Sequence, residues 1–166
     1  MTKLDFKKLN DTIRYTMWSA FKVTPGALGD NREEAVAKTK EFLARYEDTD
    51  LIIRGFYDVS AMRAEADFMF WIHAEKLEDL QAFYNAFLRE TPLGQASTPH
   101  WSNAALHRPA EFNKSHLPSF IMGEEPGRWI AVYPFVRSYD WYLLEPTERR
   151  RIPVSYTHLT LPTNRE

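Results

Sequence analysis

The order of apolar patterns over the first two thirds of the chain most constrains its fold. Four segments alternate apolar and polar side chains or are rich in aromatic and β-branched residues, which predicts strands. These segments lie at 12–23, 51–59, 66–74 and within 95–106. Two helices are expected between them, one from Arg32 and one over 77–90, because apolar residues recur there at helical spacing. The resulting βαββαβ order predicts an α+β fold, a ferredoxin-like unit with helices on one face of an antiparallel sheet.

Both predicted helices need a buried stripe. In the first helix the stripe is predicted at Val36, Thr39, Leu43 and Tyr46. In the second helix, apolar residues spaced for burial are Leu77, Leu80, Tyr84, Phe87 and Leu88. The sheet and these two stripes would make one core.

Composition limits the classes of protein that fit. The net charge of −2 gives no basic face for nucleic acid. The chain has no cysteine, so it forms neither disulfides nor thiolate metal sites. It shows no apolar run of membrane-spanning length, and residues 1–20 lack the apolar core of a signal peptide. A cytoplasmic protein without a membrane segment is therefore expected.

A proline-rich connection of about twenty residues follows the predicted unit, over about 107–127. A loop this long in a compact protein is usually functional or a linker between domains. It leads to the aromatic stretch from Arg128 to Leu144, which predicts a strand that opens a second ferredoxin-like half. A short helix is expected at 146–151, and Pro153 would end it.

Two motifs resemble one family. The pattern Tyr-Pro-Phe-x-Arg-x-x-x-Trp-Tyr occupies residues 133–142, and His-Leu-Pro-Ser-Phe occupies 116–120. Together with the opening segment, they closely resemble the actinobacterial coproheme decarboxylases of the chlorite dismutase superfamily over about residues 4–152. The resemblance implies haem b biosynthesis, in which hydrogen peroxide drives oxidative decarboxylation of two propionates of coproheme (iron-coproporphyrin III) to vinyl groups. It also implies a homopentamer and a ferrochelatase that donates coproheme.

The same resemblance assigns roles to four residues. Tyr133 matches the redox-active tyrosine and His116 matches the distal histidine that would deprotonate peroxide, while Arg137 and Trp141 match residues near a haem propionate. Each residue also has an ordinary structural interpretation: a packed strand tyrosine, an exposed loop histidine, an arginine paired with Asp140, and a core tryptophan. The resemblance favours the catalytic and propionate-binding roles.

The resemblance ends near residue 152, which sets the expected domain organisation. We expect an N-terminal ferredoxin-like half at 1–107, an inter-half loop with the distal histidine at 108–127, the start of a haem-binding half at 128–152, and a non-native tail at 153–166. The proximal histidine that ligates the iron would be lost with the missing C-terminal half. Tyr156 stands at its expected position, and His158 is not expected to replace it.

Two alternatives remain at this point. One is a chlorite dismutase-like haem enzyme, which would need a distal arginine where this chain has His116. The other is a non-catalytic, truncated ferredoxin-like oligomerisation module, because a sheet that starts at Arg128 without its partners would have an unpaired edge.

Overall fold

The computed structural model describes residues 6–30, 32–107, 117–133 and 138–151. The chain divides into two compact units, Met1–Pro126 and Gly127–Glu166, and each is described separately below. The His116 and Arg137 predictions lie outside the described residues, as does the predicted tail at 153–166.

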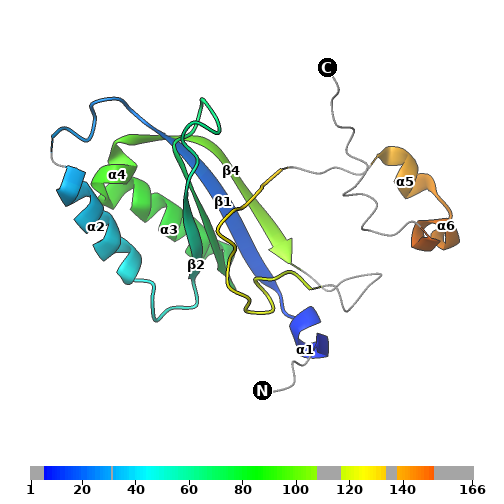
Figure 1. The fold of residues 1–166 in the computed structure, drawn as a ribbon. Helices are drawn as coiled ribbons and strands as arrows, with labels where there is room; N and C mark the ends of the chain where they lie inside the picture. Colours follow the sequence, from blue (N-terminus) through cyan, green and yellow to red (C-terminus); the bar gives the residue numbers. More distant parts are fainter. Residues whose placement is uncertain (1–5, 31, 108–116, 134–137, 152–166) are drawn as a thin grey trace. The chain divides into compact units, whose positions relative to one another are not determined.

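The first unit is built on a four-stranded antiparallel sheet. Its strands are β1 (Arg14–Val23), β2 (Ile52–Asp58), β3 (Phe68–Ala74) and β4 (Ser97–His107), in the spatial order β2-β3-β1-β4. Helices α2 (Arg32–Ala44) and α3 (Leu77–Glu90) lie on the same side of the sheet (Figure 1). Short helices α1 (Phe6–Asn10) and α4 (Pro92–Gln95) precede β1 and β4. The predicted α+β class and the ferredoxin-like unit are confirmed.

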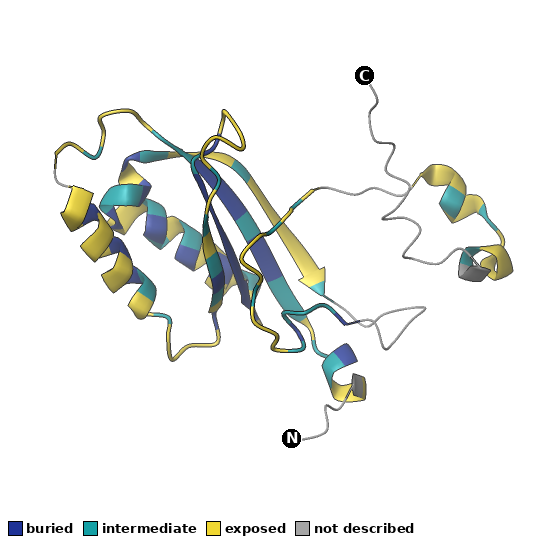
Figure 2. Cartoon of the chain, in the orientation of Figure 1, coloured by how far each residue is buried: buried dark blue, intermediate teal, exposed yellow. Residues whose placement is uncertain are grey.

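Aromatic rings fill the space between the helices and the sheet. Phe70 on β3 meets Phe83 of α3 edge-on at 5.2 Å between ring centroids, and Phe42 of α2 meets the same Phe83 at 5.3 Å. The two helices and the central strand therefore share one aromatic cluster. Figure 2 shows the buried residues concentrated on β1, β3 and the inner sides of the helices. Edge-to-face aromatic pairs add to the free energy gained from burying their area.

The buried stripe of α2 differs from the predicted one. Its buried residues are Ala35, Thr39 and Phe42, whereas Val36 is 53% exposed. Thr39 tolerates burial because its hydroxyl donates to the Ala35 carbonyl at 2.7 Å. The sequence of α2 is mostly polar, so apolar spacing alone did not fix which side faces the core. Leu43 and Tyr46 do pack against the core, as predicted.

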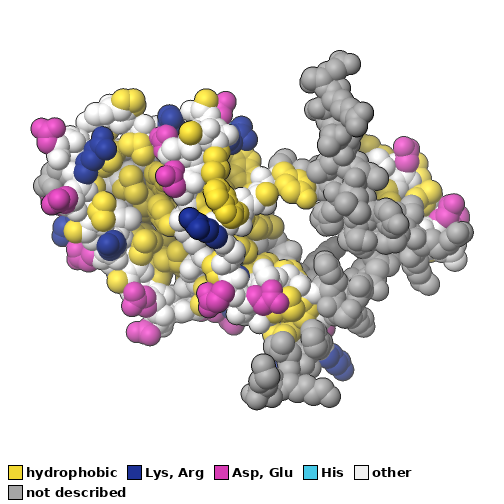
Figure 3. Space-filling view, viewed as in Figure 1, with side chains coloured by type: hydrophobic (Ala, Val, Ile, Leu, Met, Phe, Trp, Pro, Cys, Tyr) yellow, Lys and Arg dark blue, Asp and Glu magenta, His cyan; other side chains and the backbone are white. Residues whose placement is uncertain are grey.

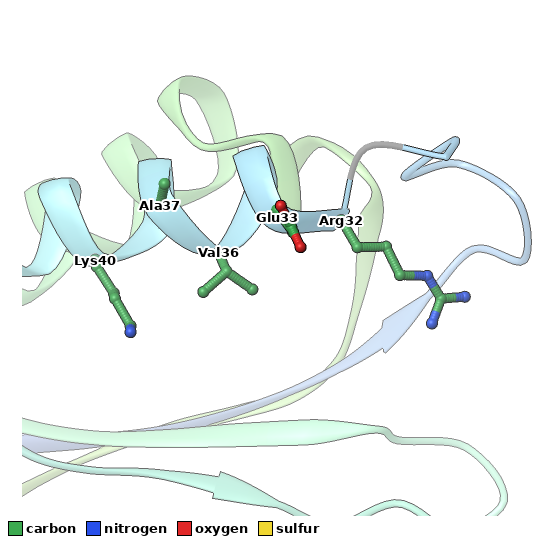
Figure 4. A pocket seen from close by; sticks show the side chains of 5 residues that line it. All are labelled: Arg32, Glu33, Val36, Ala37 and Lys40. Atoms are coloured by element: carbon green, nitrogen blue, oxygen red, sulfur yellow. The ribbon is translucent and has the colours of Figure 1, made fainter.

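The outer side of α2 carries a shallow hollow. It is lined by Arg32, Glu33, Val36, Ala37 and Lys40 (Figure 4). Apolar side chains are also visible between α2 and the β2 edge in Figure 3. The charged side chains that line the hollow, Arg32, Glu33 and Lys40, are exposed to solvent, so we assign the hollow no chemistry.

The second unit contains two short helices among its described residues. They are α5 (Tyr139–Leu143), which follows Ser138 in extended conformation, and α6 (Pro146–Arg151). Proline suits the first position of a helix because its missing N–H has no partner there in any case. The predicted helix at 146–151 is confirmed.

The predicted strand over 128–144 is wrong for the described residues. Residues 128–133 form neither helix nor strand, and 139–143 form α5. Aromatic and β-branched composition favours a strand only where another strand supplies hydrogen-bond partners. The described part of this unit contains no such strand.

The two sides of α2 give a stability prediction. Phe42→Ala should lower the free energy of unfolding by about 3–5 kcal/mol, because it removes a fully buried ring from the aromatic cluster. Val36→Ala on the same helix should change it by less than about 0.5 kcal/mol. Urea denaturation of the two variants measures both values. Equal losses would mean that the helix presents a different side to the core.

Candidate functional site

Of the four residues predicted to form the site, the structure describes Tyr133 and Trp141. The Tyr133 side chain is 49% exposed and belongs to no helix or strand. Trp141 lies on α5 and is half-buried. His116 and Arg137 lie outside the described residues, so the roles of all four remain predictions.

Trp141 joins the two helices of the second unit. Its ring meets that of Tyr142 edge-on at 5.2 Å, and the Arg149 guanidinium lies 5.8 Å from its centroid. A cation over an indole face is attracted by the ring's quadrupole. Trp141 therefore has a packing role between α5 and α6, which is compatible with a position beside a ligand.

The sheet of the first unit carries a cluster of polar and aromatic side chains that the sequence analysis did not predict. We call the side of the sheet away from α2 and α3 the second face. Because side chains alternate along a strand, the cross-strand pairs Thr16 with His73 and Trp18 with Trp71 lie on this face. The second-face cluster comprises Arg14, Asp50, Arg54, Trp71, His73 and Phe120.

Arg14 organises the polar half of the second-face cluster. Its Nε–H donates to Nδ1 of His73 at 2.9 Å, and its Nη1 and Nη2 donate to the Asp50 carboxylate and carbonyl at 2.9 and 2.8 Å. The second Asp50 carboxylate oxygen accepts from the Glu75 backbone N–H at 2.6 Å. This arrangement satisfies the hydrogen bonds of Arg14 and balances its charge.

Electrostatics keep His73 neutral. Burial, followed by the charges of Arg14 and Arg54, lowers the pKa of His73 to about 4, while Asp50 acts in the opposite direction. Burial also acts to raise the pKa of Asp50, but the bonds from Glu75 and Arg14 outweigh it and hold that pKa below its ordinary value. Since Nδ1 accepts from Arg14, the neutral ring carries its proton on Nε2. The low pKa makes His73 a poor base at neutral pH.

Aromatic side chains form the other half of the second-face cluster. The Trp71 indole N–H donates to the Thr16 hydroxyl at 2.7 Å, and the Trp71 ring stacks on Trp18 at 6.1 Å. Phe120 lies 5.2 Å from the His73 ring and 6.2 Å from the Trp71 ring. Leu117 and Ile121, on either side of Phe120, are buried. The C-terminal part of the His-Leu-Pro-Ser-Phe motif therefore packs on the second face.

The described residues offer no ready metal centre. They contain no group of three or more histidine, cysteine, aspartate or glutamate side chains placed to hold an ion. Among the described helices, none has the length and apolar character needed to cross a bilayer.

The fold and its aromatic core define an α+β protein based on a ferredoxin-like unit. Comparison with known proteins gives the family. The chlorite dismutase family model matches residues 32–159, which is most of the chain and extends past the predicted boundary at 152. The chain belongs to the chlorite dismutase family.

The curated relatives include a protein named coproheme decarboxylase from Mycolicibacterium smegmatis. It is 57% identical over 152 residues, which cover 92% of this chain and 66% of that protein. The present chain thus spans just under two thirds of the relative's length.

Solved structures agree on the fold. Chlorite dismutase from Candidatus Nitrospira defluvii in complex with imidazole matches with a TM-score of 0.69 at 21% identity, over 96% of this chain and 70% of that one. A cyanide complex of a variant of the same enzyme gives 0.68 at 20% identity, over 97% and 70%. At this level of identity the likeness supports the fold alone.

The His73 environment predicts acid sensitivity. Its folded pKa of about 4 lies below the ordinary value of 6.5, so unfolded chains take up a proton first as the pH falls from 6.5 to 4. From this group alone the free energy of unfolding should fall by about 2 kcal/mol between pH 7 and pH 5. Urea denaturation at the two pH values measures the loss.

Two variants isolate the contribution of the ring. His73→Gln retains an acceptor for Arg14 and His73→Phe does not, but neither side chain titrates. Both should show a pH dependence flatter than that of the unmodified protein by about 2 kcal/mol. A profile as steep as that of the unmodified chain would contradict a buried, neutral His73.

Proposed function

We propose that this chain carries out the chemistry of a coproheme decarboxylase, an oxidoreductase that makes haem b from coproheme with hydrogen peroxide as oxidant. The observation that carries the proposal is the 57% identity, across 92% of the chain, to a protein of that name. The chlorite dismutase family match and the shared fold support it.

The overall reaction sets what the residues must do. Each propionate loses carbon dioxide, one proton and two electrons and becomes a vinyl group, while one hydrogen peroxide takes up two electrons and two protons and becomes two waters. Bound coproheme would supply the oxidising power at its iron, and the protein would supply orientation and proton transfer. The residues fit these tasks in part. The half-exposed phenol of Tyr133 can reach a ligand, whereas the described residues of the second unit include no histidine to ligate iron.

Tyr133 would act on the propionate. A phenol can lose an electron together with its proton, and it then can take a hydrogen atom from the substrate. Arg137 would hold the reacting carboxylate by two parallel hydrogen bonds, since a planar guanidinium matches a carboxylate. Trp141 would form part of the pocket wall near that propionate.

His116 would accept a proton from hydrogen peroxide. Imidazole has an ordinary pKa close to neutral pH, so it can take up and return a proton during one cycle. A histidine in this role also favours a decarboxylase over a chlorite dismutase-like enzyme, for which we expected a distal arginine.

The same proposal implies a cellular compartment, an oligomeric state and a source of coproheme for this protein. The protein would work in the cytoplasm as a homo-oligomer, a pentamer as in the family, and would receive coproheme from a ferrochelatase. The proposed domain limits are 1–107, 108–127 and 128–152.

One observation favours a second candidate, a non-catalytic ferredoxin-like module. The four-stranded sheet lies entirely in the first unit, while several large apolar side chains of the second unit are exposed. These exposed side chains are Trp129, Tyr139, Tyr142 and Leu143. Such a module would oligomerise without binding coproheme.

Titration with ferric coproheme separates the two candidates. The purified chain is mixed with coproheme, the absorption spectrum is recorded, and hydrogen peroxide is then added while porphyrin masses are followed. We expect the porphyrin to lose mass in two successive steps. Each step should remove the mass of one carbon dioxide and two hydrogen atoms. Tyr133→Phe should abolish both losses and leave coproheme binding in place, because the ring remains and only the oxidisable hydroxyl is removed.

Tyr142→Phe is the matched control. Tyr142 is also exposed and lies in the same unit, but it has no predicted role in the reaction. Its substitution should leave both steps intact. Equal loss of activity in the two variants would refute a specific role for Tyr133, and absence of coproheme binding would favour the non-catalytic module.

A further inference from the structure

Arg54 occupies an unusual position in the sheet. The pairing of β2 with β3 shifts register between Ile53, which faces Ile72, and Gly55, which faces Trp71. Arg54 lies at this irregularity and has no cross-strand partner of its own. A bulge of this kind re-aims a side chain relative to its neighbours. The Arg54 guanidinium consequently lies over the Trp71 ring, 5.0 Å from its centroid, on the second face.

This guanidinium is buried without a complete set of acceptors. Arg54 is 9% exposed, and its Nε and Nη2 are both buried and without a hydrogen-bond partner within the described ranges. An unpaired buried charge is costly, because the protein interior replaces water poorly around it. Neighbouring Arg14 shows the usual solution, since all three of its nitrogens donate to acceptors.

The two unpartnered nitrogens define the shape of the missing acceptor. The Nε–H bond and one Nη2–H bond point the same way along one edge of the planar guanidinium, so they can donate in parallel to two oxygens of one group. The guanidinium carbon lies over the Trp71 ring, 5.0 Å from its centroid, and no described residue accepts a hydrogen bond from either nitrogen of this edge. A planar acceptor with two oxygens matches it.

The local charges define the acceptor's charge. Arg14 is balanced by the Asp50 carboxylate at 2.9 Å, with Glu75 at 4.0 Å, and His73 is neutral. The Arg54 charge is therefore the one left uncompensated among the described members of the second-face cluster. A single negative charge balances it, whereas a phosphate dianion would bring excess charge into an aromatic setting.

We propose that the Nε and Nη2 edge of Arg54 is a binding site for one carboxylate group. The carboxylate comes either from a small free molecule or from an aspartate or glutamate side chain of a protein. The proposal rests on the first unit alone and is independent of coproheme chemistry.

Nuclear magnetic resonance of the 166-residue chain labelled with ¹⁵N-arginine tests the site. The Nε–H signal of Arg54, assigned by its loss in Arg54→Lys, is followed as sodium acetate replaces sodium chloride at constant ionic strength. Arg45 is the matched internal control, because its guanidinium also lies 5.0 Å from an aromatic centroid, that of Phe42, but is exposed and paired with Glu90 at 2.6 Å.

Two results support the site and distinguish the source. For a free carboxylate, acetate shifts the Arg54 signal saturably and slows its exchange with water by about tenfold or more, while Arg45 does not respond. For a protein carboxylate, the Arg54 signal already exchanges slowly without acetate and acetate leaves it unchanged. In that case Arg54→Met lowers the urea midpoint, because it strands the partner carboxylate.

Other results overturn the proposal. One is an Arg54 signal that ignores acetate, together with a urea midpoint that is unchanged or raised in Arg54→Met, whatever the exchange rate of the signal, because burial alone slows exchange. Another is an equal response to chloride and acetate, which would show an adventitious ion only. The acetate response of the unmodified chain decides the free-carboxylate outcome, and the urea midpoint of Arg54→Met decides between a protein carboxylate and no site.

Discussion

Burial of β3 on both faces is the constraint on which the rest of the first unit depends. All seven of its residues are buried, and they alternate between two different environments. Phe68, Phe70 and Ile72 pack towards the helices, while Met69, Trp71 and His73 lie on the second face. One strand therefore supports an aromatic core on one side and a polar and aromatic cluster on the other. A change of register by a single residue would exchange these two sets.

The element order was predictable because it depends on local signals. Strand alternation and helical spacing are properties of adjacent residues, and they located the four strands and both long helices. The stripe of α2 was not predictable to the same degree, because Ala35 and Val36 are both apolar and only packing decides between them. The strand expected at 128–144 failed for a similar reason, since strand formation depends on a partner that composition does not reveal.

The second-face cluster was beyond prediction from sequence. Arg14 and His73 are separated by 59 positions and meet only because β1 pairs with β3 in one register. The orientation of Arg54 depends on the irregularity in β2, for which Gly55 is a sequence signal that our prediction did not use, because a glycine inside a strand often marks a bulge. In contrast, the motif at 133–142 indicated the family directly, because its unusual spacing of aromatic and basic residues can be recognised in the sequence without a structure. The comparisons show that the chain belongs to this family, whereas the roles of individual residues in the reaction are proposed.

The strand order also governs how the chain can fold while it is being made. β1 is the first strand to be synthesised, yet it lies between β3 and β4, and its pairing with β4 joins Val23 to Ser97 and Arg14 to His107. One edge of β1 therefore stays unpaired until more than one hundred residues have left the ribosome. Ser19 is fully buried in the folded sheet, and its hydroxyl lies 2.8 Å from the hydroxyl of Ser102 on β4. This hydrogen bond cannot form until β4 has been synthesised. Because an open strand edge invites pairing with other chains, the nascent protein is expected to be most prone to aggregation in the interval before β4 arrives.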